Sequence, residues 1–385
     1  MYKSMRRGFL AAGALLVAAL VVAGCSTGGS TTNSSEQGPV KVGALLSIKG
    51  IYAAVGVPER DALQLAFDEI NQSGGILGRQ IKVTVYDDEG DQTKAQQLAN
   101  RFVQEDKVAA VFGPGITAMA SVACPVFEQN KVLNINFTAQ RSIWEGKSYI
   151  WSSVPEDSLM AESMAKYAAD KLKAKKVVIL YSNVQYGVHG NDLLKEAIPK
   201  YQLQIAADEK WGEGNFDFTS VIGRIKTANP DAILLWGSGS PSDAQIVKQL
   251  RDQGITVTLI GNTAYVGKQL VEVAGKAAER FTAVSLMNWA APDKTTQNFV
   301  QNYQQKYNKP PTAQSAYAYD AAYRYKAAVE KAKSFDPAKV AAAMQGLQFQ
   351  SIQGSFSITA QNHVGASSAE AYHPLVVKEG KWTLP

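Results

Sequence analysis

The chain has 385 residues, of which 46% are hydrophobic and 19% charged, with a net charge of +5, 2 cysteines and 3 histidines. Its length predicts two domains at roughly 100–200 residues each, and its composition excludes a wholly disordered chain and a multi-span membrane protein. So few cysteines and histidines exclude a disulfide scaffold and a thiolate zinc cluster, and they argue against a histidine-based metal site or catalytic triad.

The chain begins with a targeting segment. Lys3, Arg6 and Arg7 precede an apolar run at 8–23, which is shorter than the roughly 20 residues of a membrane-spanning helix. A basic start, an apolar middle and small residues at the end are typical of a secretory signal peptide. Removal of these three cations lowers the net charge from +5 to +2 and leaves no basic strip, so we expect no nucleic-acid partner.

The apolar run ends in the residues VAGC at 22–25, which resemble the lipobox of bacterial lipoproteins. That resemblance implies that residues 1–24 are removed and that Cys25 is lipidated, which places the protein outside the cytoplasm on a membrane anchor. The polar stretch that follows predicts a flexible tether over 25–39. Cys124 then has no partner in the chain, and we expect it to be a buried small hydrophobe.

From Val40 onward, short β-branched runs alternate with helical periods, which predicts βαβ units and parallel sheets. The helical period is clear at Leu63, Ala66, Phe67 and Ile70, which are spaced i, i+3, i+4 and i+7. Both halves show four predicted strands at βαβ spacing, and we interpret this as a structural duplication. The strands are expected to begin near Val40, Ile81, Val108 and Val132, and near Val177, Leu203, Ala232 and Val257.

The C-terminal region has one more strand, two helices and two short strands, which are too few for a third core. We expect them to complete the first two domains, so the chain must cross between the domains more than once. Such crossings make a hinge and a cleft. The predicted fold class is therefore α/β, with two doubly wound parallel-sheet lobes. The late elements are expected at 281–286, 295–307, 313–333, 349–358 and 371–377; lobe 1 is expected to span 40–157 and 285–350, and lobe 2 158–284 and 351–385.

Polar and aromatic residues gather where the predicted strands end, and ligands of open α/β sheets bind beyond the carboxyl ends of the strands. These residues offer hydroxyls, backbone N–H groups and ring faces, with few acids or bases. The Gly, Ser and Thr residues among them are also common turn and helix-cap residues, so it is the coincidence in both halves that indicates a ligand site. The candidates are Ser47, Tyr52, Gly115, Ile116, Thr117, Phe137, Thr138, Ala139, Gln140, Tyr186, Ser238, Thr263 and Tyr265.

The stretch GPGITA at 113–118 fits a dinucleotide-binding pattern only weakly. The acidic residue expected about 20 positions later is missing, because Asn134, Ile135 and Asn136 lie there. What remains is a helix N-terminus, whose free N–H groups and positive dipole end suit a small anion. Thr117 adds a hydroxyl donor at that position.

Other motifs argue against metal or catalytic chemistry. The acidic run at 87–91 does not complete a calcium loop, and we interpret it as a solvated loop that caps a helix from Gln92. The tyrosines between 317 and 325 are interpreted as packing between a helix and a sheet. There is no P-loop, GxSxG or HExxH motif, so the sequence predicts no cofactor and no enzyme.

One string is more specific. NQSGGILGRQI at 71–81, followed by Tyr86-Asp87-Asp88, resembles the type I solute-binding proteins, and more narrowly the leucine/isoleucine/valine-binding family of ABC importers. The resemblance continues at 113–114, 185–187 and 216–219 and covers essentially residues 40–380. It implies two lobes joined by three crossovers, ligand-induced closure and delivery of the ligand to a membrane permease.

The resemblance also implies roles for individual residues. The hydroxyl that holds the ligand carboxylate corresponds to Thr117, with further donors from Thr138 and Gln140. Tyr186 matches an aromatic residue that covers the ligand. The acid that binds an amino group falls near Thr263, which carries no charge.

Three further positions leave alternatives open. A tyrosine of the family falls near Val55, although Tyr52 is close. Asp157 is an alternative anion for a ligand amine, and it is equally well explained as a helix cap. Arg141 adjoins the site, and a surface role is favoured over pairing with a ligand. The ligand class stays open between a hydrophobic amino acid and a carboxylate or amide without an α-amine.

We therefore expect a monomeric, lipid-anchored extracytoplasmic receptor that captures a small organic solute and presents it to an ABC permease. A sensing module of the same fold and a secreted α/β hydrolase are the alternatives. A neighbouring permease gene favours import, and turnover of a ligand would favour the hydrolase.

Overall fold

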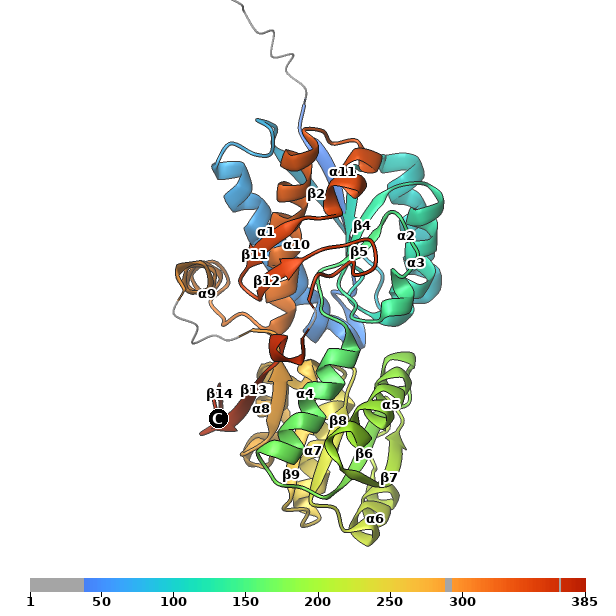
Figure 1. The fold of residues 1–385 in the computed structure, drawn as a ribbon, viewed down its shortest axis with the longest axis vertical. Helices are drawn as coiled ribbons and strands as arrows, with labels where there is room; N and C mark the ends of the chain where they lie inside the picture. Colours follow the sequence, from blue (N-terminus) through green and yellow to red (C-terminus); the bar gives the residue numbers. More distant parts are fainter. Residues whose placement is uncertain (1–37, 288–292, 367) are drawn as a thin grey trace, which may run out of the picture. The chain divides into compact units, whose positions relative to one another are not determined.

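The computed structural model describes residues 38–287, 293–366 and 368–385 (Figure 1). The predicted signal peptide, the predicted lipidation site Cys25 and almost all of the predicted tether lie outside the described residues. Within the described ranges, no helix is long and apolar enough to cross a membrane.

The first sheet is entirely parallel, with the order β2-β1-β3-β4-β5. Its central strands are buried on both faces, as expected for a sheet covered by helices on two sides. The order in which strands are added to the sheet reverses between β1 and β3, which is where the helix connections diverge to opposite faces. The strands are β1 (Val40–Leu46), β2 (Ile81–Asp87), β3 (Ala110–Phe112), β4 (Leu133–Asn136) and β5 (Ile150–Ser152).

The second sheet repeats this order in its parallel part, β7-β6-β8-β9-β10, and extends it by two antiparallel strands at one edge. The shared order agrees with the predicted duplication. The strands are β6 (Lys176–Ser182), β7 (Gln204–Trp211), β8 (Ala232–Trp236), β9 (Thr258–Gly261), β10 (Thr282–Ser285), β13 (His373–Lys378) and β14 (Lys381–Thr383).

Helices cover both sheets (Figure 1). The helices are α1 (Ala53–Gln72), α2 (Gln92–Arg101), α3 (Thr117–Gln129), α4 (Asp157–Asp170), α5 (Gln185–Ala197), α6 (Thr219–Ala228), α7 (Pro241–Asp252), α8 (Lys268–Ala274), α9 (Lys294–Tyr307), α10 (Ala313–Ala332) and α11 (Pro337–Met344). Short 3-10 turns lie at Gly50–Tyr52, Arg141–Ile143, Ile198–Tyr201, Thr263–Tyr265, Gly275–Ala278 and Ala369–Ala371, and a π turn lies at Phe102–Asp106.

The predicted amphipathic helix explains how α1 is held. Leu63, Ala66, Phe67 and Ile70 are all buried, and the ring of Phe67 meets that of Phe112 on β3 edge-on at 5.2 Å. Burying a large side chain such as Leu63, Phe67 or Ile70 stabilises the fold by roughly 1.5–3 kcal/mol. The predicted burial of these four side chains is therefore confirmed.

The chain passes between the two sheets three times: between β5 and α4, between β10 and α9, and between residue 366 and β13. A fully buried arginine on α10, Arg324, fixes two of these segments. Its Nη1 donates to the carbonyl oxygens of Ser152 at 2.6 Å and Val364 at 3.2 Å. The predicted α/β fold with two doubly wound lobes joined by three crossovers is confirmed.

Several short elements differ from the prediction. The strands β5 and β14 and the helix α11 were not expected, because each is too short to show a period. The predicted strand at 349–358 is a hairpin of β11 (Gln348–Ser351) and β12 (Gly354–Ser357), since Ile352 and Gln353 form a turn that is followed by Gly354 with φ +118°.

The predicted boundary of lobe 2 at residue 351 is also wrong. Phe356 and Val364 belong to the core cluster that β3 and α3 share, so this segment packs against the first sheet. The remaining lobe boundaries stay a proposal. Cys124, also in that cluster, is buried as expected.

Candidate functional site

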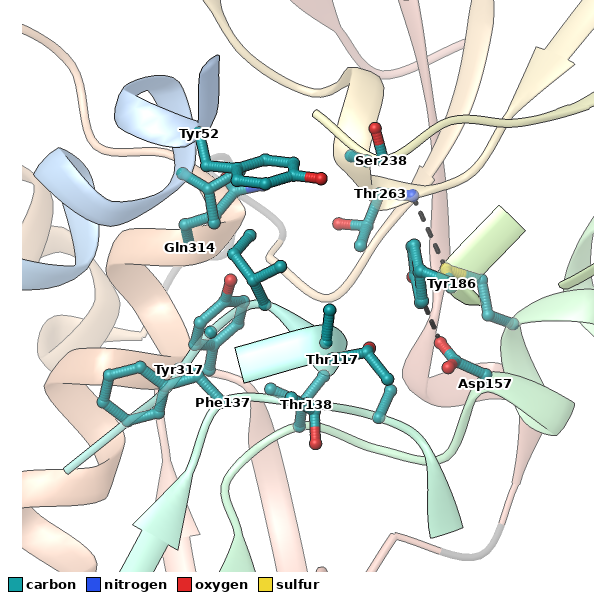
Figure 2. Close-up of a pocket in the computed structure, with 18 of the residues that line it drawn as sticks. Tyr52, Thr117, Phe137, Thr138, Asp157, Tyr186, Ser238, Thr263, Gln314 and Tyr317 are labelled. Atoms are coloured by element: carbon teal, nitrogen blue, oxygen red, sulfur yellow. Dashed lines mark hydrogen bonds between the residues drawn. The ribbon is translucent and has the colours of Figure 1, made fainter. Parts of the chain in front are cut away.

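A pocket lies where the carboxyl ends of both sheets meet, as Figure 2 shows. The space between protein atoms here is about 700 Å³, a figure that includes open solvent at the mouth of the pocket. Most of the sequence-predicted site residues line it together: Tyr52, Gly115, Ile116, Thr117, Phe137, Thr138, Ala139, Asp157, Tyr186, Ser238 and Thr263. Residues from both halves of the chain therefore share one pocket. That these residues bind a ligand is still a prediction.

Three predicted site residues do not line the pocket, because their side chains are used elsewhere. The Ser47 hydroxyl donates to Asp88 Oδ1 at 2.5 Å. The Gln140 amide donates to the Ser142 hydroxyl at 2.9 Å. Tyr265 packs its ring on Phe281 at 5.0 Å, in the core of the second sheet. Each residue lies near the end of a strand, as the sequence pattern predicted. The pattern located the residue in the chain but did not give the direction of its side chain.

The N-terminus of α3 supplies backbone donors. Its cap, Ile116, makes no side-chain capping bond, and the Ile116 carbonyl accepts from the N–H groups of Met119 and Ala120. The N–H groups of Thr117 and Ala118 have no partner within the helix, as is general for a first turn. With the positive end of the helix dipole, they suit a carboxylate.

Thr138 does not offer the donors that the resemblance implied. Its backbone N–H and its hydroxyl both donate to Asn136 Oδ1, at 3.0 and 2.8 Å. Its carbonyl accepts from the Ser152 hydroxyl at 2.7 Å. The donors of Thr138 are therefore occupied within the protein, and its role as a carboxylate donor stays a prediction.

Asp157 is the only Asp, Glu, Lys, Arg or His among the described lining residues. It is 1% exposed; Oδ1 accepts from the Tyr186 hydroxyl at 3.2 Å, and Oδ2 has no hydrogen-bond partner among the described residues. Burial raises the pKa of Asp157 to about 8 and lowers the pKa of His189, whose Nε2 lies 3.8 Å from Oδ2. Asp157 is the first residue of α4, whose cap is Glu156, so the helix-cap alternative is wrong.

Aromatic rings form the apolar walls. Tyr186 lies 5.8 Å from the buried Trp236, and Phe137 lies 5.6 Å from Tyr317. Tyr317 was expected only to pack, yet it lines the pocket and its hydroxyl donates to Glu59 at 3.0 Å. Helical periodicity alone does not separate a packing ring from one that also reaches a cavity, which is why the sequence missed it.

Other lining residues were also missed: Ala118, Val154, Met160, Val184, Gln185, Ala264, Gln314 and Tyr372, together with Val55, which was considered only as a position near Tyr52. Gln314 is the second residue of α10 and Tyr372 lies on the third crossing, so neither follows a predicted parallel strand. Gln185 and Ala264 are next in sequence to the predicted residues Tyr186 and Thr263. This adjacency is the signal by which the sequence could have identified them.

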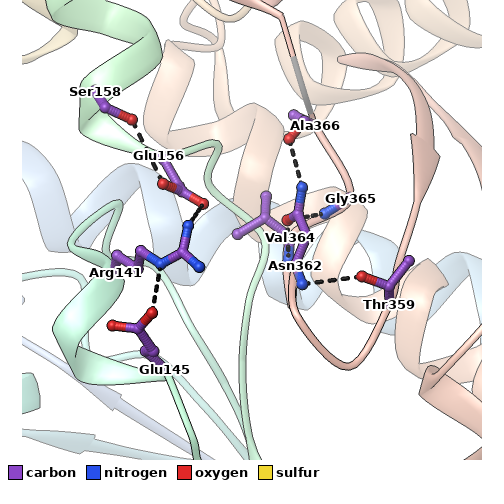
Figure 3. A network of polar contacts seen from close by, with 9 residues as sticks. All are labelled: Arg141, Glu145, Glu156, Ser158, Thr359, Asn362, Val364, Gly365 and Ala366. Carbon is purple, nitrogen blue, oxygen red and sulfur yellow. Dashed lines mark hydrogen bonds and ion pairs between the residues drawn. The ribbon is translucent and has the colours of Figure 1, made fainter.

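Arg141 lies at the surface, as favoured (Figure 3). It is about half exposed, and it pairs with Glu145 at 2.8 Å and Glu156 at 3.3 Å. In the same region, the Asn362 side chain accepts from the N–H groups of Val364 and Gly365 and so shapes the loop before the third crossing. The guanidinium of Arg141 is thus committed outside the pocket.

The acidic loop at 87–91 caps a helix as interpreted, but it is not wholly solvated, because Asp88 is buried. Asp91 caps α2 by accepting from the N–H of Lys94 at 2.7 Å. Asp88 accepts from the Gly90 N–H in the turn.

Comparison with known proteins decides the family. A family model described as periplasmic binding protein matches residues 39–374. The chain belongs to the periplasmic binding protein family. Within it, the chain is a type I member of the leucine/isoleucine/valine-binding group, as the resemblance predicted.

Individual relatives agree. The chain is 25% identical over 318 residues to a leucine-, isoleucine-, valine-, threonine- and alanine-binding protein of Pseudomonas aeruginosa, covering 82% of this chain and 84% of the relative. This periplasmic binding protein also superposes on the leucine-binding protein LivK of Thermotoga maritima with a TM-score of 0.82 at 25% identity, covering 90% and 97% of the two chains.

A further neighbour carries a ligand. The branched-chain amino acid substrate-binding protein LivJ of Streptococcus pneumoniae, solved in complex with isoleucine, matches with a TM-score of 0.81 and 27% identity over 89% of this chain and 97% of its own. The family is one of solute-binding proteins of transporters.

Proposed function

We propose that this chain is the lipid-anchored extracytoplasmic receptor of an ABC importer, and that it captures a small organic ligand bearing a carboxylate or amide. The observation that carries the proposal is the pocket itself, in which the N-terminus of α3 faces loops and helices of the second sheet. Relatives that bind aliphatic amino acids, one of them complexed with isoleucine, support the class.

The pocket favours a hydrophobic α-amino acid. A ligand carboxylate has donors in the N–H groups of Thr117 and Ala118. A ligand ammonium has two buried acceptors without partners among the described residues, Asp157 Oδ2 and Thr263 Oγ1. Each charge-assisted bond of this kind contributes about 1.5–3 kcal/mol.

A ligand without an amine is the second candidate, because two observations favour it. Thr263 is uncharged where the resemblance implies an acid, and the raised pKa of Asp157 keeps that carboxyl largely neutral at pH 7. A carboxylate or amide with an aromatic or aliphatic body then needs only the N-terminus of α3 and the aromatic walls.

Either class of ligand can supply the free energy that binding requires. Micromolar binding requires about −8 kcal/mol. A few charge-assisted bonds and the apolar surface covered by Tyr186, Phe137 and Val55 supply that amount, and bonds of this kind strengthen when water is excluded.

The test is a thermal-shift panel of aliphatic amino acids, the same acids without their amino groups, aromatic carboxylates, amides and urea. A ligand at 100 times its dissociation constant adds roughly 2.7 kcal/mol to the free energy of unfolding. Stabilisation by the amino acids but not by their deaminated forms selects the first candidate. Stabilisation by both selects the second, and no stabilisation contradicts the proposal.

Transport and anchoring need their own test. We expect metabolic labelling with a radioactive fatty acid to mark the full chain and not a Cys25→Ser variant. Uptake of the identified ligand that stops when the adjoining permease is deleted supports import over sensing. The enzyme alternative has no support, since the family is one of binding proteins.

A further inference from the structure

Three hydroxyl groups of the pocket share one property: each donates its proton to a carboxyl group that does not itself line the pocket. Tyr52 and Ser238 both donate to Glu213, and Tyr317 donates to Glu59. A hydroxyl has one proton and two lone pairs, so once the proton is donated outward only acceptors remain for a ligand.

Glu213 holds two of these hydroxyls, one from each side of the pocket. Its Oε2 accepts from Tyr52 at 3.3 Å, and its Oε1 accepts from Ser238. Both oxygens are therefore occupied by lining residues, and the backbone N–H of Glu213 is tied to Asn183 Oδ1 at 3.3 Å. The two hydroxyls are fixed in one orientation.

Glu59 holds the third hydroxyl and is itself locked in place. It is 1% exposed, and a Cβ added to Gly115 would lie 2.0 Å from its Oε1 and 2.5 Å from its Oε2. The Glu59 carboxyl thus fills the space that a side chain at position 115 would need. We call Gly115 and the Glu59 carboxyl behind it the pocket floor. The nearby cations Arg60 and Lys309 are paired with Asp61 instead.

Two of these acceptors lie away from Asp157. Figure 2 shows Tyr52, Gln314 and Tyr317 on one side of the pocket and Tyr186 and Asp157 on the other, with Thr117 between them, while Ser238 lies beside Thr263. A ligand whose carboxylate binds at Thr117 and whose amine binds at Asp157 therefore extends its body toward the end formed by Tyr52 and Tyr317.

Building on the proposed function, we propose that the body of the ligand ends in a neutral hydrogen-bond donor, a hydroxyl or a primary amide, which Tyr52, Ser238 and Tyr317 accept. The donor is neutral because no charged side chain lines this end among the described residues. A purely aliphatic body would leave buried acceptors unpaired, and sites built for a polar group reject the apolar isostere strongly.

The experiment compares isosteric pairs by calorimetry: threonine with valine, asparagine with leucine, and tyrosine with phenylalanine. Each pair keeps the α-amino and carboxylate groups and differs in the donor at the far end. We expect at least a tenfold tighter dissociation constant for the polar member of the pair that fits. Equal or tighter binding of the apolar member in every pair that binds overturns the proposal while leaving the proposed function intact. If no member of any pair, nor of the wider panel, stabilises the protein, the proposed function fails and this proposal fails with it.

Two variants at one position test the mechanism. In Glu59→Gln, the amide oxygen still accepts from Tyr317, and the preference for the polar member persists. In Glu59→Leu, the Tyr317 hydroxyl is free to donate into the pocket, and the preference falls at least threefold. The same fall in both variants, or in neither, overturns the role of Glu59. Affinity for the apolar member and the thermal midpoint, measured in parallel, reveal a merely misfolded variant. Tyr317→Phe deletes the acceptor hydroxyl itself, so the preference for the polar member should fall in this variant as it does in Glu59→Leu.

Discussion

The two sheets share one strand order but supply the pocket with different chemistry. The side of the first sheet offers backbone groups, namely the N–H groups of Thr117 and Ala118 at the start of α3, together with the Tyr52 and Tyr317 hydroxyls. The second offers side chains, among them Tyr186, Ser238 and Thr263. A common topology therefore fixes where polar groups converge, since strand ends and helix starts meet there, but it does not fix which groups they are.

This difference has a consequence for specificity. Backbone donors at a helix N-terminus bind an anionic group of almost any ligand, because they do not depend on a side chain. Side chains such as Asp157 distinguish one ligand from another. Substitutions at the start of α3 should therefore affect all ligands together, and those of lining side chains such as Asp157 and Tyr317 should change the ranking among ligands.

The largest expected effect is the pH dependence introduced by Asp157. The folded state keeps this carboxyl protonated up to about pH 8, whereas the unfolded chain ionises it near pH ~4. The unfolded state therefore binds fewer protons between these values, and the free energy of unfolding falls as the pH rises through them. Each unit of pKa difference is worth about 1.4 kcal/mol, so the total is several kcal/mol.

Asp157→Asn should remove that part of the slope and leave a more stable protein at pH 8, with little difference below pH ~4. Urea denaturation of both proteins across this range measures the effect. Asp243, whose pKa burial raises to about 7, contributes its own slope to both proteins and cancels in the comparison. Parallel curves for the two proteins would contradict the neutral buried state of Asp157.

The next effect tests the floor on the side of the first sheet. In Gly115→Ala, the new methyl group would lie 2.0 Å from Glu59 Oε1, which forces the floor to shift. We expect a loss of roughly 1–3 kcal/mol in stability and a loss of affinity for every ligand tested. Gly223→Ala on α6 is the control, because nothing lies within 4 Å of its added Cβ. Wild-type affinity in Gly115→Ala would mean that the ligand does not contact this floor.

A smaller effect separates two neighbouring threonines. Thr117→Ala removes one hydroxyl at the start of α3 and should weaken binding several-fold, corresponding to about 1 kcal/mol. Thr138→Val should change affinity less, because the Thr138 hydroxyl already donates to Asn136, although it should cost stability. Calorimetry on both variants gives the answer. A larger loss of affinity in Thr138→Val would reverse the assignment of the carboxylate site.

The smallest effect is expected at the surface. Arg141→Gln removes two exposed ion pairs, which together contribute about 0–1 kcal/mol, and the side chain does not line the pocket. Affinity should remain within twofold of wild type and the thermal midpoint nearly unchanged. A large loss of affinity would show that Arg141 reaches the ligand after all.

The sequence predicted the sheets well because their signals are local. Runs such as that from Ala232 show the continuous apolar character of a buried strand, and Leu63 and Phe67 show the helical period. The three-residue strands β5 and β14 show neither, since they are defined by the neighbours with which they pair. Such elements depend on tertiary structure and are not visible in one sequence.

The site was predicted less well because strand ends locate backbones, not side chains. Ser47 and Tyr265 stand at strand ends but point to Asp88 and Phe281. Tyr317 and Gln314 enter the pocket from a helix that is distant in sequence. Their contribution depends on how α10 packs on α1, which the periodicity of either helix does not specify.

The most direct measurement is a crystal structure of the protein with the tightest ligand from the panel. We predict that the ligand lies between the two sheets and that its carboxylate or amide oxygen accepts from the N–H groups of Thr117 and Ala118. A ligand bound elsewhere, or one whose polar head points away from the start of α3, would contradict the central claim.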